Sequence, residues 1–387
     1  MSPEHMRQLT DIYFTEIQPV YKFLELALES GDIPDSMTSV LLGIAALACL
    51  FSNQHTDLES EIIQNARSSL EYTTTLESPT VDHIVAWLLR VIFLRFNSSP
   101  NAAWIASCTL MHMIETVNLH LDPQLGDLDE TTDSLYSPRL KRQIYCTAHI
   151  FHTWISYEYG KPRVIPHEAS HAAPLEGWTT VDRVVWRLSD ALDPTQHVDS
   201  TELENMLLQV AELQPSHPAV QLKRCNIALC IYRRLRVAGR SISKEVIDQI
   251  LHIVDDGLTH ATAMAKKKLP WWHILNVPFQ AVCVLLAIDT KESLRRVEES
   301  FRTLNLIACE YGTRAIDKTW NSACSLLAIQ SRRKREDLDV LSRVENVFAT
   351  AGYTATDSSL TGRVGEGFAS EMLWDLEQIL STNICGL

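Results

Sequence analysis

The chain of 387 residues lacks the sequence features that identify several protein classes. Its nine cysteines include no C-x-x-C pair, which argues against a zinc finger, and their odd number does not fit a framework of disulfides. There is no glycine-rich phosphate loop, no G-x-S-x-G nucleophile motif and no obvious pair of catalytic carboxylates. The cysteines lie singly, mostly within apolar runs, and this pattern predicts buried, reduced thiols in an intracellular protein.

Positive charge and long apolar runs are also scarce. The chain has 48 Asp and Glu residues against 34 Lys and Arg, a formal net charge of -14. Because such a chain repels a phosphate backbone, we expect no direct DNA binding by it. Residues 1–11 are polar, and the apolar run at 40–51 is about a dozen residues long, whereas a membrane span needs roughly 20. We therefore expect a soluble protein that does not enter a membrane.

Helical periodicity is abundant, and strand signals are few. Hydrophobic residues make up 46% of the chain, and only 13 residues are glycine. Apolar residues recur at spacings of three and four, which is typical of helices. Ser99 and Pro100 fit an N-cap and the first helical position. The pattern predicts an all-α, large multi-helix protein with helices over 11–28 (broken at Pro19), 36–51, 83–96, 100–117, 140–159, 181–192, 200–213, 218–238, 244–267, 270–287, 291–311, 314–333 and 368–380.

Proline and small polar residues suggest how the chain is divided. Prolines interrupt the helical pattern within 160–178, so we expect an irregular passage there and a sub-boundary inside one large helical domain over 1–349. The stretch 350–367 is rich in Thr, Ser and Gly and predicts a flexible linker. A final segment, 368–387, predicts a C-terminal acidic-aromatic helix.

Several segments, taken in order, are similar to the landmarks of one protein family. They are DIYF at 11–14 with QPVY at 18–21, AAW at 102–104 with Met111 and VNLHLDP at 117–123, and RLKRQIY at 139–145 running on to GKP at 160–162. This series resembles the middle homology region of fungal zinc-cluster transcription factors. Lys161 replaces the commoner arginine, and His152-Thr153 stands where an acidic residue and an arginine are usual. The similarity extends over most of residues 10 to 176.

The resemblance implies an all-helical regulatory domain that acts in the nucleus, with possible shuttling from the cytoplasm, on a metabolic or biosynthetic gene set. It implies protein partners, namely a second copy, an intact zinc-cluster factor or a coactivator, together with a possible small-molecule effector; no cofactor is expected. The family's DNA-binding head needs six clustered cysteines, whereas the first cysteine here is Cys49, in an apolar run. Two alternatives stay open: an enzyme on the same helical scaffold, and an interaction protein that modulates an intact factor.

Two groups of ring-bearing residues could line a small-molecule pocket between helices. One group follows Pro270, and the other lies on the predicted helix 140–159. On that helix Cys146, His149 and His152 recur at a spacing of three, and side chains of these types could bind one metal ion together. Side chains of both kinds more often fill the core of a helical protein. The pocket candidates are His149, His152, Trp271, Trp272 and His273.

The sequence HEASH at 167–171 has the form of a zinc-protease signature. That chemistry needs His167 and His171 on one face of a stable helix, but Pro166 and Pro174 leave under two turns. We therefore expect a surface loop here and no metal site.

A basic run, Arg332-Arg333-Lys334-Arg335, has two interpretations. It is of the kind that nuclear import receptors read, and it is equally typical of a solvated helix end, where cations complement the helix dipole.

The final segment alternates acidic and bulky apolar residues, a composition found in activation motifs that fold against coactivators. Its anchors would be Leu373, Trp374 and Leu376. The competing interpretation is a helix docked on its own domain.

Overall fold

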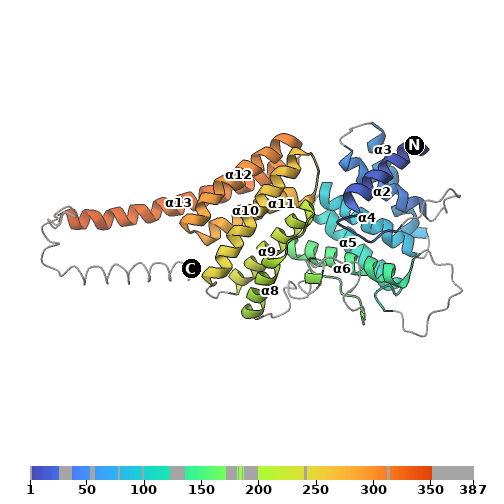
Figure 1. The fold of residues 1–387 in the computed structure, drawn as a ribbon, viewed down its shortest axis with the longest axis horizontal. Helices are drawn as coiled ribbons and strands as arrows, with labels where there is room; N and C mark the ends of the chain where they lie inside the picture. The colour runs from blue at the N-terminus through green and yellow to red at the C-terminus, as the bar shows by residue number, and fades with distance from the viewer. Residues whose placement is uncertain are drawn as a thin grey trace.

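The chain folds almost entirely into helices in a computed structural model that describes residues 2–25, 37–52, 57–76, 79–97, 100–122, 136–170, 181, 183–184, 186, 199–238, 242–311 and 314–350 (Figure 1). No strand occurs in these residues, which confirms the predicted all-α class. The elements are α1 (Pro3–Ile12), a π-helical turn η1 (Tyr13–Ile17), α2 (Thr38–Phe51), α3 (Asp57–Leu76), α4 (Val81–Asn97), α5 (Pro100–Thr116), α6 (Pro138–Tyr159), α8 (Ser200–Glu212), α9 (Pro218–Val237), α10 (Lys244–Lys266), α11 (Trp272–Ile288), α12 (Lys291–Tyr311) and α13 (Arg314–Thr350).

The helices form two groups that follow the order of the chain. Helices α1 to α6 pack among themselves, with α4 in contact with α2, α3, α5 and α6. Helices α8 to α13 form the second group, in which α9, α10 and α11 pack against one another and α12 covers α10 and α11. Figure 1 shows the two groups side by side, and we call them the N-terminal and C-terminal halves.

Local sequence sets the ends of helix α6. The side chain of Ser137 accepts a hydrogen bond from the Leu140 backbone N–H at 3.2 Å, and Pro138 occupies the first helical position. Gly160 ends the helix in the left-handed region at φ 60°, which glycine adopts without a Cβ penalty. The irregular passage predicted after this helix therefore begins at Gly160.

Helices α9 and α10 pack closely at a glycine. A Cβ atom placed on Gly257 would lie 2.6 Å from Cys225 Sγ and 3.1 Å from Val277 Cγ1. These neighbours come from α9 and α11, so a larger residue at 257 would have to separate three helices that form the centre of the C-terminal half.

A buried arginine joins α8 to α9. Arg224 is 2% exposed and donates to the carbonyls of Val210 and Ala211, at 3.0 and 2.6 Å. It also lies 3.3 Å from Asp256. The last turn of a helix leaves carbonyls without partners inside the helix, and this guanidinium satisfies two of them.

Two helices end at other residues than predicted, and one helix was not predicted. A helix over 11–28 was expected, but α1 and η1 end at Ile17, and residues 21–25 have no helical structure. The apolar side chains of Tyr21, Phe23 and Leu24 are buried there all the same, because the extended segment runs through the core. Helix α3 was not predicted, and α13 continues to Thr350 where an end at 333 was expected.

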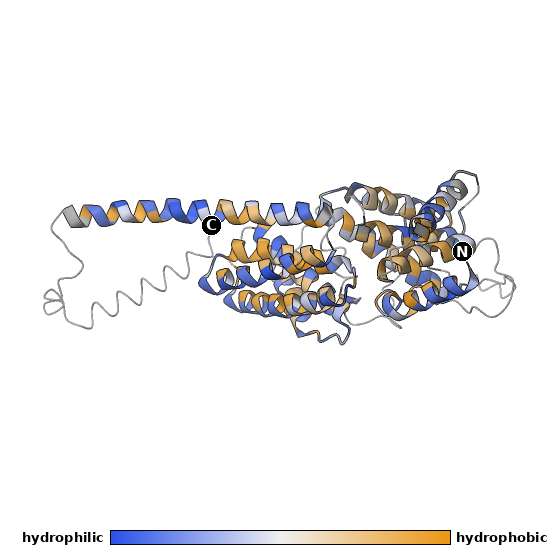
Figure 2. Ribbon diagram, turned by 90° about the horizontal axis from the view of Figure 1, so that it is seen from above, coloured by the Kyte–Doolittle hydropathy of each residue, from blue (hydrophilic) through white to orange (hydrophobic). Residues whose placement is uncertain are grey.

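The last part of α13 extends away from the rest of the molecule (Figure 2). From Arg332 to Val347 every side chain is exposed. The helix persists because this stretch contains no proline or glycine and carries charge pairs at spacing four, such as Arg332 and Glu336 at 4.0 Å. Its continuation, the linker 350–367 and the acidic-aromatic segment 368–387, falls outside the described residues beyond Thr350.

None of the helices in the described part of the chain is both long enough and apolar enough to cross a membrane.

Candidate functional site

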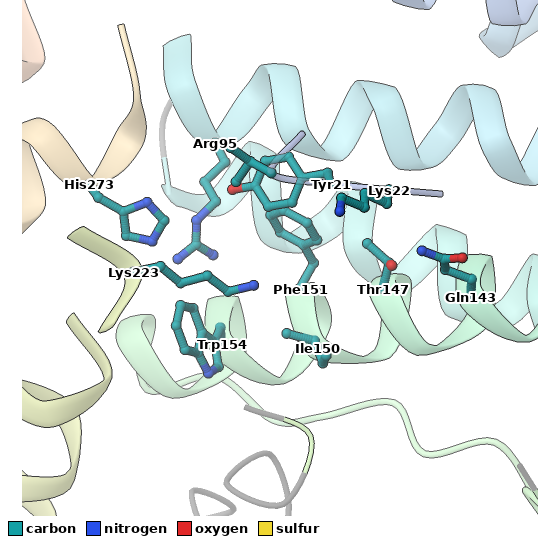
Figure 3. Close-up of a pocket in the computed structure, with 11 residues that line it drawn as sticks. Tyr21, Lys22, Arg95, Gln143, Thr147, Ile150, Phe151, Trp154, Lys223 and His273 are labelled. Carbon is teal, nitrogen blue, oxygen red and sulfur yellow. The ribbon is translucent and has the colours of Figure 1, made fainter. Parts of the chain in front are cut away.

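A pocket that is partly open to solvent lies where the two halves meet (Figure 3), and its empty space, open solvent included, is about 550 Å³. One wall comes from the N-terminal half, with the extended segment at 20–22, Arg95 of α4 and one face of α6. The other wall comes from the C-terminal half, with Lys223 of α9 and His273 of α11. The remaining lining residues are Gln143, Thr147, Ile150, Phe151 and Trp154.

Arg95 is the central charge of this pocket. Its Nη2 lies 2.8 Å from Glu158 Oε2, and the two side chains are 3% and 6% exposed. The guanidinium also lies 5.3 Å from the ring centre of Trp272 and 5.9 Å from that of Phe151. A buried charge needs such compensation, since removing it from water is costly. Arg95 Nη1 has no hydrogen-bond partner within the described residues, so one donor of the guanidinium is unused.

Two asparagine side chains connect the Arg95–Glu158 pair to the C-terminal half through hydrogen bonds. Asn226 Nδ2 donates to Glu158 Oε1 at 3.4 Å, and Asn276 Nδ2 donates to Asn226 Oδ1 at 2.8 Å. These residues come from α4, α6, α9 and α11 in turn. A hydrogen-bonded network of buried groups resists rearrangement, so this network fixes how the two halves meet on one side of the pocket.

His273 faces the pocket from α11. It is 3% exposed, and neither ring nitrogen has a hydrogen-bond partner within the described residues. Burial, with the nearby charges of Arg95 and Lys223, holds the pKa of His273 well below its ordinary value. The ring is therefore neutral and offers one donor and one acceptor. Its only described ring contact is with Trp154, 6.3 Å away between centres.

The two tryptophans that precede His273 do not line the pocket. Trp271 is 2% exposed, and its indole lies 5.3 Å from Phe51, 5.8 Å from Phe96 and 5.8 Å from Tyr21, between ring centres. This cluster joins α2 and α4 to the start of α11 and packs as core. Trp272 stacks against Arg95 and supports the pocket without lining it. Of the three residues predicted here, the structure brings His273 into the pocket.

His152 and His149 lie elsewhere on α6, beneath the segment 161–166. The Val164 backbone N–H donates to His152 Nε2 at 2.7 Å, and His152 Nδ1 lies 2.9 Å from Ser107 Oγ. Burial, followed by the charges of Arg163 and His112, lowers the pKa of His152 to about 4. Both nitrogens are thus engaged, and His152 connects α5, α6 and the segment after α6.

His149 packs beside the same segment. Its ring centre is 5.1 Å from that of Trp186, and Arg163 donates to Nε2 at 3.4 Å. Burial, with the charges of Arg163 and His152, lowers its pKa to about 3. Neither this histidine nor His152 lines the pocket.

The sequence HEASH at 167–171, which has the form of a zinc-protease signature, begins in an exposed turn. The side chain of His167 is 83% exposed, and His171 lies outside the described residues. In the part of the chain that is described, no three His, Cys, Asp or Glu residues come together as a metal site would require.

The basic run lies on α13. Lys334 pairs with Asp289 at the end of α11, with Nζ 2.5 Å from Oδ2. Arg332, Arg333 and Arg335 are exposed. The C-terminal anchors Leu373, Trp374 and Leu376 lie outside the described residues.

Arg95 and Lys223 were missed from the sequence, although both carry a signal. Arg95 stands between Leu94 and Phe96, and Lys223 lies one helical turn from apolar residues on either side, where a charge must find compensation. Glu158, 63 positions from Arg95, could not be chosen as its partner without the fold.

Comparison with known proteins gives one family. The family described as "Fungal specific transcription factor domain" matches residues 10–175. "Transcription factor kojR" of Aspergillus oryzae is 35% identical over 99% of this chain and 74% of its own length. "Protein RDR1" of Gibberella zeae is 36% identical over 90% of the chain, and "Protein RDR1" of Saccharomyces cerevisiae 30% over 88%; the matches span 66% and 65% of those two proteins. No solved structure matches.

Proposed function

Because this chain belongs to the family of fungal-specific transcription factors and acts in transcriptional regulation, we propose that it is a regulatory domain whose output depends on a small molecule bound between its two halves. The observation that carries the proposal is the origin of the pocket lining. Arg95 and Phe151 come from the N-terminal half, and Lys223 and His273 come from the C-terminal half. A ligand that touches both walls stabilises one arrangement of the halves over another.

The transcriptional role places the action of the chain in the nucleus. We also propose how the chain enters the nucleus and which kind of genes it controls. The basic run Arg332–Arg335 would be read for import, since all four of its cations are exposed. The genes controlled would be a metabolic or biosynthetic set, as the resemblance implies. Enzymatic activity on the same scaffold was the alternative; the kojR relative is named for transcription, which favours regulation.

Protein partners complete the proposal. We expect a second copy of the chain, or an intact zinc-cluster factor, to bind it. Support comes from apolar side chains exposed along the projecting part of α13, namely Leu338, Val340, Leu341, Val344 and Val347. Apolar residues gathered on one helix mark a protein contact more often than scattered ones do.

The test is a reporter assay in which the full chain is fused to a foreign DNA-binding domain. Lys223→Met keeps the length of a pocket side chain and removes its charge, and Lys267→Met does the same at an exposed position. We expect Lys223→Met to change reporter output by about threefold or more, because a small shift in a two-state population suffices. The control should match the wild type, and equal output from all three fusions would contradict the proposal.

A further inference from the structure

Residues 332–347, the projecting part of α13, have an exposed apolar face (Figure 2). Leu338, Leu341 and Val344 recur at a spacing of three and therefore share one side of the helix, and Val340 lies one turn before Val344. These four side chains are 47 to 60% exposed. Because most helices in proteins are stabilised by the packing of an apolar face, this face points to a partner that packs on it.

The charges of the same stretch disfavour a parallel pairing of two copies. A basic run at 332–335 is followed by acidic residues, with one further arginine, Arg343, among them. The acidic residues are Glu336, Asp337, Asp339 and Glu345. In a parallel, in-register pair each residue lies near its own counterpart, so the basic run would repel the basic run of the second copy.

An antiparallel pairing removes this conflict. When the two-fold axis passes between residues 339 and 340, Leu338 lies opposite Leu341 of the second copy, and Glu336 lies opposite Arg343 of the second copy. The symmetry repeats both relations, so the contact holds two apolar pairs and two pairs of opposite charge. Apolar contact at the centre with opposite charges at the edges selects both the partner and the direction of paired helices.

The remaining charges agree with this register. Lys334 lies opposite Glu345 of the second copy, and over 332–347 no residue lies opposite one of the same charge. Lys334 already pairs with Asp289 of its own chain, so its contribution to a dimer is the smaller one.

Glu336 and Arg343 are placed to make the contact between the copies. They lie four residues before and three residues after Val340, so both border the apolar face. Within the chain, Glu336 lies 4.0 Å from Arg332, and Arg343 Nε donates to the Asp339 carbonyl at 3.3 Å. A carboxylate accepts several hydrogen bonds and a guanidinium donates five, so both side chains retain the capacity to pair with a second copy.

The acidic-aromatic segment 368–387 is the other occupant that this chain offers. It contains acidic residues but no lysine or arginine. Along 336–345 it would therefore place acids beside the acids of α13, which is unfavourable. A second copy of α13 fits the surface better, because it brings charges of both signs.

We propose that α13 pairs antiparallel with α13 of a second copy of this chain, about a two-fold axis between residues 339 and 340. The contact region is about 24 Å long, which gives an interface below the standard size of about 1,600 Å². Interfaces of that class are typical of transient association, so the dimer should form reversibly. The inference deepens the proposed function by naming its partner, and it rests on that function only for the consequence in transcription.

The experiment is sedimentation equilibrium of the purified full chain from about 1 to 200 μM at low salt, where dimerisation should increase with concentration. Leu341→Gln should weaken the dimer about tenfold or more, because a few central side chains carry most of the affinity of an interface. Val237→Gln, which changes an exposed apolar side chain of α9, should leave it unchanged. A chain that stays monomeric at every concentration would overturn the inference and leave the segment 368–387 or an intact factor as the occupant.

Charge reversals test the direction and the register. Glu336→Arg and Arg343→Glu should each weaken the dimer about fivefold or more, since each places like charges opposite one another at both symmetric positions. An equimolar mixture of the two variants should dimerise like the wild type, and so should the double variant Glu336→Arg/Arg343→Glu. Single variants as strong as the wild type, or a mixture no stronger than either variant alone, would contradict the antiparallel register.

The reporter assay separates this inference from the proposed function. Loss of the dimer in Leu341→Gln, with unchanged reporter output, supports the contact and contradicts its role in transcription. A reporter that responds to Lys223→Met, from a chain that is monomeric at every concentration, supports the proposed function and overturns the pairing of α13.

Discussion

Arg95 of α4 and Glu158 of α6 form an ion pair of 2.8 Å whose side chains are 3% and 6% exposed. Glu158 in turn accepts from Asn226 of α9, so the pair lies where the two halves join. The same pair forms part of the pocket and part of the junction. A ligand at Arg95 therefore acts on the contact between the halves.

Breaking this pair should destabilise the protein strongly. We expect Glu158→Ala to lower the free energy of unfolding by about 3–5 kcal/mol, because it leaves the Arg95 charge buried without its partner. Urea denaturation measures the change. The double variant Arg95→Met/Glu158→Leu should recover a large part of it, and a loss under 1 kcal/mol in Glu158→Ala would show that the pair is unimportant.

Gly257→Ala should destabilise the C-terminal half by about 1–3 kcal/mol through overpacking. The added Cβ would lie 2.6 Å from Cys225 Sγ. Adding Cys225→Ala removes the clashing sulfur and should restore part of the loss in a thermal melt. A double variant as unstable as the sum of its single variants would argue against this contact.

Acid should destabilise the fold through buried histidines. The pKa of His152 is lowered to about 4 in the folded chain, from an ordinary value of 6.5. Between these pH values the unfolded chain binds more protons, so stability rises with pH there and is lost as pH falls from 6.5 toward 4. His152→Gln should flatten this dependence in urea unfolding measured from pH 7.5 to 5.

His167 is the control for that series. Its side chain is 83% exposed, and His167→Gln should change the pH dependence far less than His152→Gln does. An identical slope in wild type and His152→Gln would contradict the assignment.

The basic run on α13 should direct nuclear import. Replacing Arg332, Arg333 and Arg335 with Gln removes three exposed cations without touching the Lys334–Asp289 pair. A fluorescent fusion should then move from the nucleus to the cytoplasm. The triple variant Lys266→Gln/Lys267→Gln/Lys268→Gln removes a basic cluster of the same size, and a nuclear signal in both variants would favour the solvated-helix interpretation.

The acidic-aromatic segment remains a prediction, since 368–387 falls outside the described residues. We expect residues 366–387, fused to a foreign DNA-binding domain, to activate a reporter. Trp374→Ala should abolish the activity, because a buried aromatic side chain contributes on the order of 2 kcal/mol or more to a small interface. A silent fusion would favour a helix docked on its own domain.

The sequence predicted helices where apolar periodicity coincided with caps. Helix α6 shows this, with its expected span of 140–159 and its end at Gly160. Helix prediction failed where residues are buried without helical periodicity, or are helical with little burial. Tyr21, Phe23 and Leu24 are apolar because the extended segment crosses the core. Helix α3 was missed because few of its residues are buried: among its side chains that the structure describes, they are Ile62, Ala66 and Leu70.

Only part of the pocket was predicted, because apolar patterns along the chain do not show which elements meet. His273 was identified by the aromatic residues beside it, but Trp271 is core, and His149 and His152 hold the segment after α6. Arg95, Lys223 and Phe151 come together from three helices that are far apart in the sequence. Periodicity along one helix shows which face is buried and cannot show what that face meets.

The central claim is that a small molecule bound at the junction ties the two halves together. Amide hydrogen exchange of the full chain, measured with and without a low-molecular-weight extract of fungal cells, tests it most directly. Slower exchange in peptides from both α6 and α9, with unchanged exchange in α3, is the predicted result. Protection confined to one half, or no protection at all, would contradict the claim.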